Sequence, residues 1–195
     1  MRLRRLHLSE KFSKNSIFAM DETACWFDTP SDTTIDVTVA KSVSIKTTGH
    51  EKNHFMVVLT AKADGTKMKP FVVFKGKGTR LMKELGAILG LIVKFSSNGW
   101  MNEAQTIEYL HTILGSLSFA KCLMVWDAYK CHMSEAVKFE CARLKFQTSV
   151  VSGGCTQFIQ AADVAWNGPF KSHLRSSYDT WLSEPYCHEY TKGGT

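Results

Sequence analysis

The stretch Lys121–Asp127, KCLMVWD, most constrains the fold, because its apolar run stays unbroken until it ends on a carboxylate. A strand with one solvated face alternates apolar and polar residues, whereas a strand covered on both faces is apolar throughout. The run therefore predicts a central strand with cover on both sides of the sheet. It also raises a question: why should a buried strand end on Asp127?

The rest of the chain alternates between strand and helix signals. Period-two or apolar runs predict strands at Ser16–Glu22, Ser42–Thr48, Phe55–Ala63, Met68–Phe74 and Gln147–Val151. The composition of residues 29–34 predicts a turn-rich loop, and Asp64-Gly65 predicts a hairpin turn. Helices are expected after the capping residues Asn102 and Ser134. A final helical period runs from about Asp163 to Leu182, with Pro169 either kinking it or lying in a first turn.

This order of elements predicts an α/β fold: a mixed sheet flanked by helices. Strands come first, and helices and strands then alternate. The order is that of a ribonuclease-H-like fold, although order alone leaves other α/β folds open.

The charge balance favours a polyanionic partner. Lys and Arg number 24 against 18 Asp and Glu, which gives a net charge of +6. Nucleic acid is the partner that such a charge suits best, and a basic soluble enzyme is the alternative. No apolar run approaches the roughly 18 residues of a membrane span, so no membrane association is expected.

Three aspartates stand at comparable places: Asp21 in the first strand, Asp127 at the end of the central strand, and Asp163 at the start of the last helix. Side chains alternate along a strand, so Asp21 shares a face with Ala19 while Glu22 points away. If the strands of Asp21 and Asp127 are neighbours, both carboxylates emerge side by side at the sheet's edge.

Clustered carboxylates repel one another unless a cation compensates their charge. Mg²⁺ or Mn²⁺ suits all-oxygen ligation, and two such ions about 3.5–4 Å apart can carry out phosphodiester chemistry. A metal requirement would then explain why the strand ends on Asp127. Taken singly, Asp21 and Asp127 are equally typical of strand-end turns, and Asp163 of a helix cap.

The sequence around these acids resembles the DDE-superfamily catalytic domain of pogo/Tigger-like transposases and of proteins derived from them. The matching words, in family order, are MDETACWFD (20–28), KSVSIKTTGHEKNHFMVVLTAKADGTKMKPFVVFKG (41–76), NGWMNE (98–103), LMVWDAYKCH (123–132) and SGGCTQFIQAADVAWNGPFK (152–171). They cover most of the chain from Asn15 to Leu182. Asp127 and Asp163 are separated by 35 residues, a spacing typical of the family.

The resemblance implies a ribonuclease-H-like fold with Asp21, Asp127 and Asp163 as catalytic residues and as ligands of a two-metal Mg²⁺ or Mn²⁺ site. Relatives cut DNA at element ends and join the freed 3′-hydroxyl to target DNA, with no small-molecule cofactor. Ala162, Ser152 and Gly168 depart from the family's common residues, but no carboxylate is lost.

The expected organisation is an N-terminal extension (1–14), a DDE-type catalytic domain (15–182) and a C-terminal tail (183–195). A chain of 195 residues leaves no room for the helix-turn-helix modules that such transposases usually carry, so a catalytic domain alone is expected. The competing hypothesis is a domesticated or decayed DNA-binding or regulatory protein without catalysis. DNA is the expected partner and the nucleus the expected location; a homodimer is left open.

Other side chains have two interpretations each. His132 could orient the metal site, contact phosphate, or be satisfied by backbone. Asn167 could support the acids, and Lys171 with Arg175 could contact phosphate or form a solvated helix face. Trp26, Trp100 and Trp126 are expected in the core rather than as residues that stack on bases. A basic loop is expected either beside DNA or simply exposed to solvent: Lys75, Lys77 and Arg80.

Overall fold

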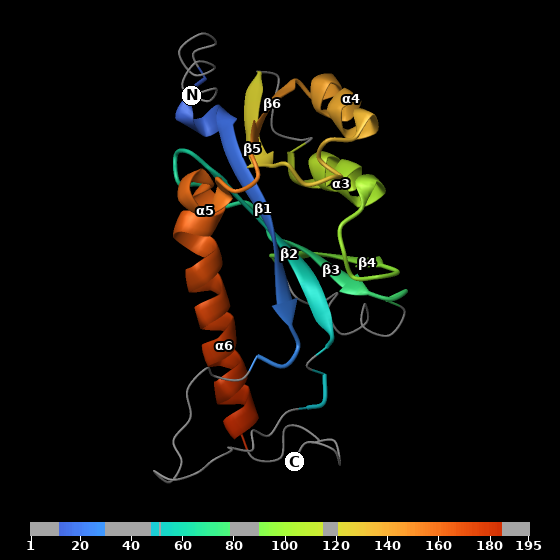
Figure 1. Cartoon of the computed structure of the whole chain (residues 1–195), viewed down its shortest axis with the longest axis vertical. Coiled ribbons are helices and arrows are strands. Elements are labelled where there is room, and N and C mark those ends of the chain that lie inside the picture. Colours follow the sequence, from blue (N-terminus) through green and yellow to red (C-terminus); the bar gives the residue numbers. More distant parts are fainter. Residues whose placement is uncertain (1–11, 30–47, 51, 79–89, 115–120, 185–195) are drawn as a thin grey trace.

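The computed structural model describes residues 12–29, 48–50, 52–78, 90–114 and 121–184 (Figure 1). Its strands are β1 (Ile17–Trp26), β2 (His54–Lys62), β3 (Phe71–Lys75), β4 (Ile92–Ser96), β5 (Cys122–Asp127) and β6 (Phe146–Val151). Its helices and helical turns are η1 (Lys14–Ser16), α3 (Glu103–Tyr109), η2 (Leu110–Leu114), α4 (Glu135–Arg143), α5 (Thr156–Ile159), η3 (Ala162–Trp166) and α6 (Asn167–Ser183). The predicted extension (1–14), tail (183–195), loop (29–34) and strand (42–48) lie almost entirely outside the described residues.

All six strands form one mixed sheet in the order β4-β3-β2-β1-β5-β6. β1 runs antiparallel to β2 and parallel to β5, and β5 runs parallel to β6. The prediction that the KCLMVWD run forms an inner strand is confirmed, since β5 lies between β1 and β6. Strand β4 was not predicted, because Ile92–Ser96 has neither a clear period-two pattern nor flanking hairpin signals.

Short-range hydrogen bonds set the element boundaries that the sequence predicted. The Asn102 side chain accepts a hydrogen bond from the amide of Gln105 at 3.0 Å, and Ser134 Oγ accepts one from the amide of Val137 at 3.3 Å. Gln105 does not complete a capping box; its Nε2 donates instead to the carbonyl of Phe95. Pro169 lies in the first turn of α6, one of the two predicted outcomes.

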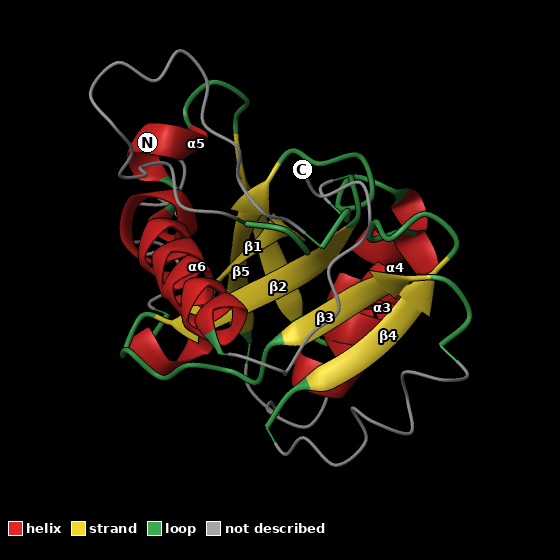
Figure 2. Cartoon of the chain, turned by 90° about the horizontal axis from the view of Figure 1, so that it is seen from below, coloured by secondary structure: helices red, strands yellow, loops and turns green. Residues whose placement is uncertain are grey.

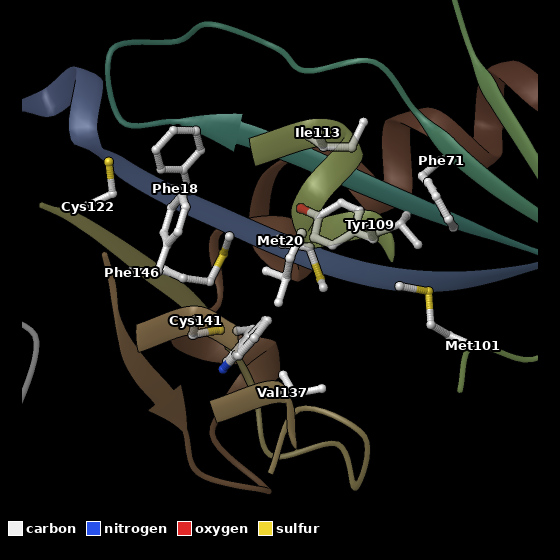
Figure 3. Packing of buried hydrophobic residues seen from close by; sticks show 14 of the residues in the cluster. Phe18, Met20, Phe71, Met101, Tyr109, Ile113, Cys122, Val137, Cys141 and Phe146 are labelled. Atoms are coloured by element: carbon white, nitrogen blue, oxygen red, sulfur yellow. The ribbon is translucent and has the colours of Figure 1, made fainter. Parts of the chain in front are cut away.

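Helices cover both faces of the sheet (Figure 2). On one face, α3, η2 and α4 pack over the even-numbered side chains of β1, such as Phe18 and Met20, to form the main core (Figure 3). On the other face, Phe170 and Leu174 of α6 pack near Cys25, Val57 and Val72. Odd-numbered β1 residues, Asp21 included, therefore face the α5–η3–α6 side.

The tryptophan prediction is correct at one position and wrong at two. Trp126 is 1% exposed and belongs to the main core, but Trp26 and Trp100 are 46% and 40% exposed. Trp26 is the last residue of β1, and Trp100 lies in the turn before α3. Within the described residues, no helix is long and apolar enough to cross a membrane.

Candidate active site

Asp21 and Asp127 lie on neighbouring parallel strands in matched register. The β1–β5 pairing includes Ile17 with Leu123 and Ala19 with Val125, and the same register extended by two residues sets Asp21 beside Asp127. The predicted adjacency of the two strands is confirmed. Asp21 does not end its strand, however, since β1 continues five residues further to Trp26.

Asp163 approaches Asp21 from the opposite layer. It lies in η3, a π-helical turn that follows Ala161 and leads directly into α6, so it is not the predicted helix cap. The Nδ2 of Asn167 donates to Asp21 Oδ2 at 2.6 Å and to Asp163 Oδ1 at 3.2 Å. One amide thus links two of the three acids. Single π-turns of this kind occur frequently at functional sites.

Gln160 is a site residue that the sequence did not indicate. Its Nε2 donates to Asp21 Oδ1 at 2.6 Å, so each oxygen of Asp21 receives one carboxamide donor. Gln160 and Asn167 are 2% and 8% exposed, and within the described part of the chain the buried oxygen of each carboxamide has no hydrogen-bond partner. The position of Gln160, three residues before Asp163 in the last matching word, was the only signal of its role in the sequence.

Burial dominates the electrostatics of Asp21. Desolvation raises its pKa from the ordinary 3.8 to about 6, against the lowering effect of the hydrogen bond from Asn167. The charges of Asp163 and Asp127 also raise it, so the three carboxylates lie close enough to interact. Such an arrangement is stable with all three acids ionised only when positive charge is added.

His132 joins Asp127 to Glu22. Its Nδ1 donates to Asp127 Oδ1 at 3.0 Å and its Nε2 to Glu22 Oε1 at 3.1 Å. The ring is 2% exposed and stacks on Trp126 with centroids 4.5 Å apart. Burial lowers the pKa of His132, but the bonds to the two carboxylates outweigh it and raise it to about 9. A cationic imidazole therefore holds the carboxylate of Asp127 in place, as the orienting interpretation of His132 requires.

The Asp127 carboxylate also stabilises the turn that follows β5. Its Oδ1 accepts a hydrogen bond from the Tyr129 amide at 3.1 Å. Burial raises the pKa of Asp127, but the bonds from His132 and Tyr129 outweigh it and hold the pKa below its usual range. Glu22, which faces away from Asp21 as predicted, thus supports the site from the other side of the sheet through His132.

Of the residues predicted to contact DNA, two are buried and two are at least partly exposed. Both ring nitrogens of His132 are occupied, and Asn167 is directed at the acids, so neither presents a free donor to phosphate. Lys171 is exposed on α6, and Arg175 is half-buried one turn further on. Lys171 lies near enough to Cys25 that its charge lowers the pKa of that thiol, against a larger raising effect of burial.

The three carboxylates offer oxygen atoms, the kind of ligand that Mg²⁺ and Mn²⁺ prefer. Among the described residues, no group of three or more His, Cys, Asp or Glu side chains is arranged to hold an ion. The two carboxylate oxygens of Asp21 instead accept hydrogen bonds from the side-chain amides of Gln160 and Asn167.

The fold and the site define a ribonuclease-H-like domain with two acids on the neighbouring strands β1 and β5 and the third in the π-helical turn η3. Solved structures agree with this fold. The Mos1 transposase paired-end complex with left transposon end matches with a TM-score of 0.59 at 11% identity, covering 93% of this chain and 50% of that one. The Mos1 mariner paired-end complex with Mn matches at 0.60 and 12%, covering 93% and 51%.

Sequence comparison gives the family. The DDE superfamily endonuclease model matches residues 52–190. "Pogo transposable element with KRAB domain" from Mus musculus and its Homo sapiens counterpart are each 26% identical over 166 residues, which is 83% of this chain and 27% of each relative. The chain belongs to the DDE superfamily endonuclease family, and its predicted resemblance to pogo/Tigger-like transposase catalytic domains is confirmed. It spans about a quarter of the length of these relatives.

Proposed function

We propose that this chain is a transposase-type DNA nuclease domain that cleaves and transfers DNA strands with the help of Mg²⁺ or Mn²⁺. The single observation that carries the proposal is the Asp21–Asn167–Asp163 link beside the register that aligns Asp21 with Asp127. These three acids are the proposed metal ligands. When bound, two divalent ions would activate the attacking oxygen and stabilise the leaving one.

The chain's own residues have separate tasks in this proposal. His132 keeps Asp127 oriented and ionised, and Gln160 with Asn167 fixes the plane of the Asp21 carboxylate. The family's nucleophile is water or a DNA 3′-hydroxyl, so no side chain needs to act as a covalent nucleophile. DNA as the partner is supported by the Mos1 neighbours, which include a paired-end complex with the left transposon end and a strand transfer complex.

Two further proposals follow from a DNA substrate. Paired-end complexes of the neighbours support a homodimer of the whole protein. A nuclear location follows from the substrate. The competing function, DNA binding without cleavage, is supported by the net charge of +6, which does not depend on the three acids.

The test is cleavage of labelled duplex DNA in Mg²⁺ or Mn²⁺ by the wild-type chain and by Asp127→Asn. Loss of a direct ligand should reduce nicking by more than the roughly 10–100-fold typical of outer-shell changes. Asp179→Asn, on α6 away from the acids, is the matched control and should nick like the wild type. Equal nicking by Asp127→Asn would refute the proposal, and DNA binding without any nicking would favour the competing function.

A further inference from the structure

A surface of exposed rings and lysines lies at the end of the sheet beyond the three acids. We call it the aromatic–basic surface and define it by Trp26, Phe27, His54, Trp100, Lys52, Lys75 and Lys77. Trp26, Phe27 and Trp100 are 46%, 43% and 40% exposed, and all three lysines are exposed. Large exposed aromatics that lie together commonly mark a binding site.

The rings are held in place by one another. The His54 ring lies between the two indoles, with centroids 5.3 Å from Trp26 and 4.7 Å from Trp100. Phe27 contacts Phe55 at 5.3 Å. Because each exposed ring already has a partner on one side, little side-chain freedom remains to be lost when a ligand covers the other side.

The turn before α3 is shaped to deliver Trp100 to this surface. The Asn98 side chain accepts a hydrogen bond from the Trp100 amide at 3.0 Å, and Gly99 adopts a left-handed φ of +79°. A Cβ at Gly99 would lie 3.3 Å from Lys75 Cβ and 3.5 Å from His54 Nε2. The absence of a side chain at this position therefore lets the turn at Gly99 pack against Lys75 and His54.

The chemistry of the surface selects a ligand with both flat rings and negative charge. A cavity of about 410 Å³ is lined by Phe27, His50, Lys52, Asn53, His54, Phe74 and Lys75. No carboxylate occurs among these described lining residues. A protein-docking surface would be depleted of lysine at its centre, whereas single-stranded nucleic acid is bound by rings that stack on bases beside cations that contact phosphates.

We propose that the aromatic–basic surface binds unpaired bases of a single-stranded DNA segment. Trp26 lies five residues beyond Asp21 on β1, roughly 17 Å at about 3.3 Å per residue. That distance corresponds to about five stacked nucleotides at about 3.4 Å each. Trp26 faces the opposite side of the sheet from Asp21. The surface would therefore hold the unpaired flank of a strand that passes around the end of the sheet to reach the three acids. Only this placement on a substrate rests on the proposed nuclease function; the base binding itself does not.

The test measures binding alone, in EDTA, so that it does not depend on cleavage. Fluorescence anisotropy with a labelled oligo-dT strand compares the wild type with Trp26→Ala, Trp100→Ala and the double variant. Each base that loses its stacking partner should weaken binding about 5- to 150-fold. Duplex DNA, whose base faces are covered, should bind all variants within about twofold of the wild type. Trp181→Ala, an exposed tryptophan on α6, is the matched control.

An abasic strand of the same length gives a second arm that needs no variant. It carries the phosphates without the bases, so the wild type should bind it as weakly as the double variant binds oligo-dT. The loss of affinity caused by removing the bases and the loss caused by removing the two indoles should not add, so the double variant should bind the abasic strand no more weakly than the wild type does. Lys75→Ala should instead reduce the salt dependence of binding, by a slope of about 0.7 for one lost phosphate contact. Trp26→Phe keeps a ring and should retain most of the affinity if Trp26→Ala fails to fold.

Two results would overturn the inference: equal wild-type affinity for abasic and oligo-dT strands, or unchanged oligo-dT affinity in the folded double variant. A chain that binds bases here but does not nick DNA would leave this inference standing and refute the nuclease proposal. A chain that nicks DNA without base-dependent binding would do the reverse.

Discussion

Replacing Asp21 with asparagine should stabilise the metal-free protein at neutral pH. Burial, and to a smaller extent the charges of Asp163 and Asp127, raise the pKa of Asp21 to about 6. Asparagine has nearly the same shape without the charge. Its oxygen can accept from Asn167, and its amide can donate to the Gln160 oxygen, now unpartnered, after that carboxamide rotates.

The magnitude follows from linkage. A carboxyl with a pKa of about 6 in the folded state and an ordinary value of 3.8 binds its proton more tightly when folded. Its contribution to stability is therefore fully present below pH 3.8 and is lost as the pH rises through 6. The difference corresponds to about 3 kcal/mol, at about 1.36 kcal/mol per pH unit. Asp21→Asn should recover most of it at pH 7.5 and almost none at pH 3.5.

The assay is urea unfolding in EDTA at several pH values between 3.5 and 8, with the free energy of the wild type subtracted from that of the variant. Subtraction removes the contributions of other titrating groups, and Asp179→Asn should show no such pH dependence. Added Mn²⁺ should stabilise the wild type, by about 2.7 kcal/mol at a hundred times its Kd, and leave Asp21→Asn unchanged. A variant that is less stable than the wild type at pH 7.5, or whose gain is flat with pH, would refute the electrostatic reasoning.

Two further predictions concern buried hydrogen bonds. His132→Ala leaves Asp127 and Glu22 without their shared cation and should cost about 3 kcal/mol at pH 6. Because the pKa of His132 is raised from 6.5 to about 9, the stability from its charge is present below pH 6.5 and fades through pH 9; a loss in urea unfolding that stays the same at pH 10 would contradict this. Tyr109→Phe removes the 2.6 Å bond to Thr60 inside the core and should cost about 1–3 kcal/mol, while adding Thr60→Val should restore much of it. A double-mutant cycle measures this coupling, and additive losses would show that the bond contributes nothing.

Several elements could be predicted because their causes are local. The Asn102 and Ser134 caps, the Asp64-Gly65 turn and the apolar β5 run depend on side chains within a few positions of one another. The adjacency of Asp21 and Asp127 needed one more assumption, that their strands are neighbours, and the sheet order supports it.

Long-range contacts made the other features unpredictable. Gln160 and Asn167 reach Asp21 across 139 and 146 positions of sequence, and His132 reaches Glu22 across 110. Alternation along β1 correctly separated Glu22 from Asp21, but it could not show that a histidine would connect Glu22 back to the site. Nor could composition show that Trp26 and Trp100 remain exposed.

The amino-acid sequence by itself predicted many of the local elements, because periodicity and capping operate over a few residues. It also carried the family words in which the three proposed site acids stand. Only the tertiary structure decided which polar groups satisfy those acids, how strongly burial shifts the pKa of Asp21, and which aromatic rings remain exposed. Those outcomes depend on which distant segments pack together and exclude water. The periodicity of a sequence reports only local structure and does not reveal that packing.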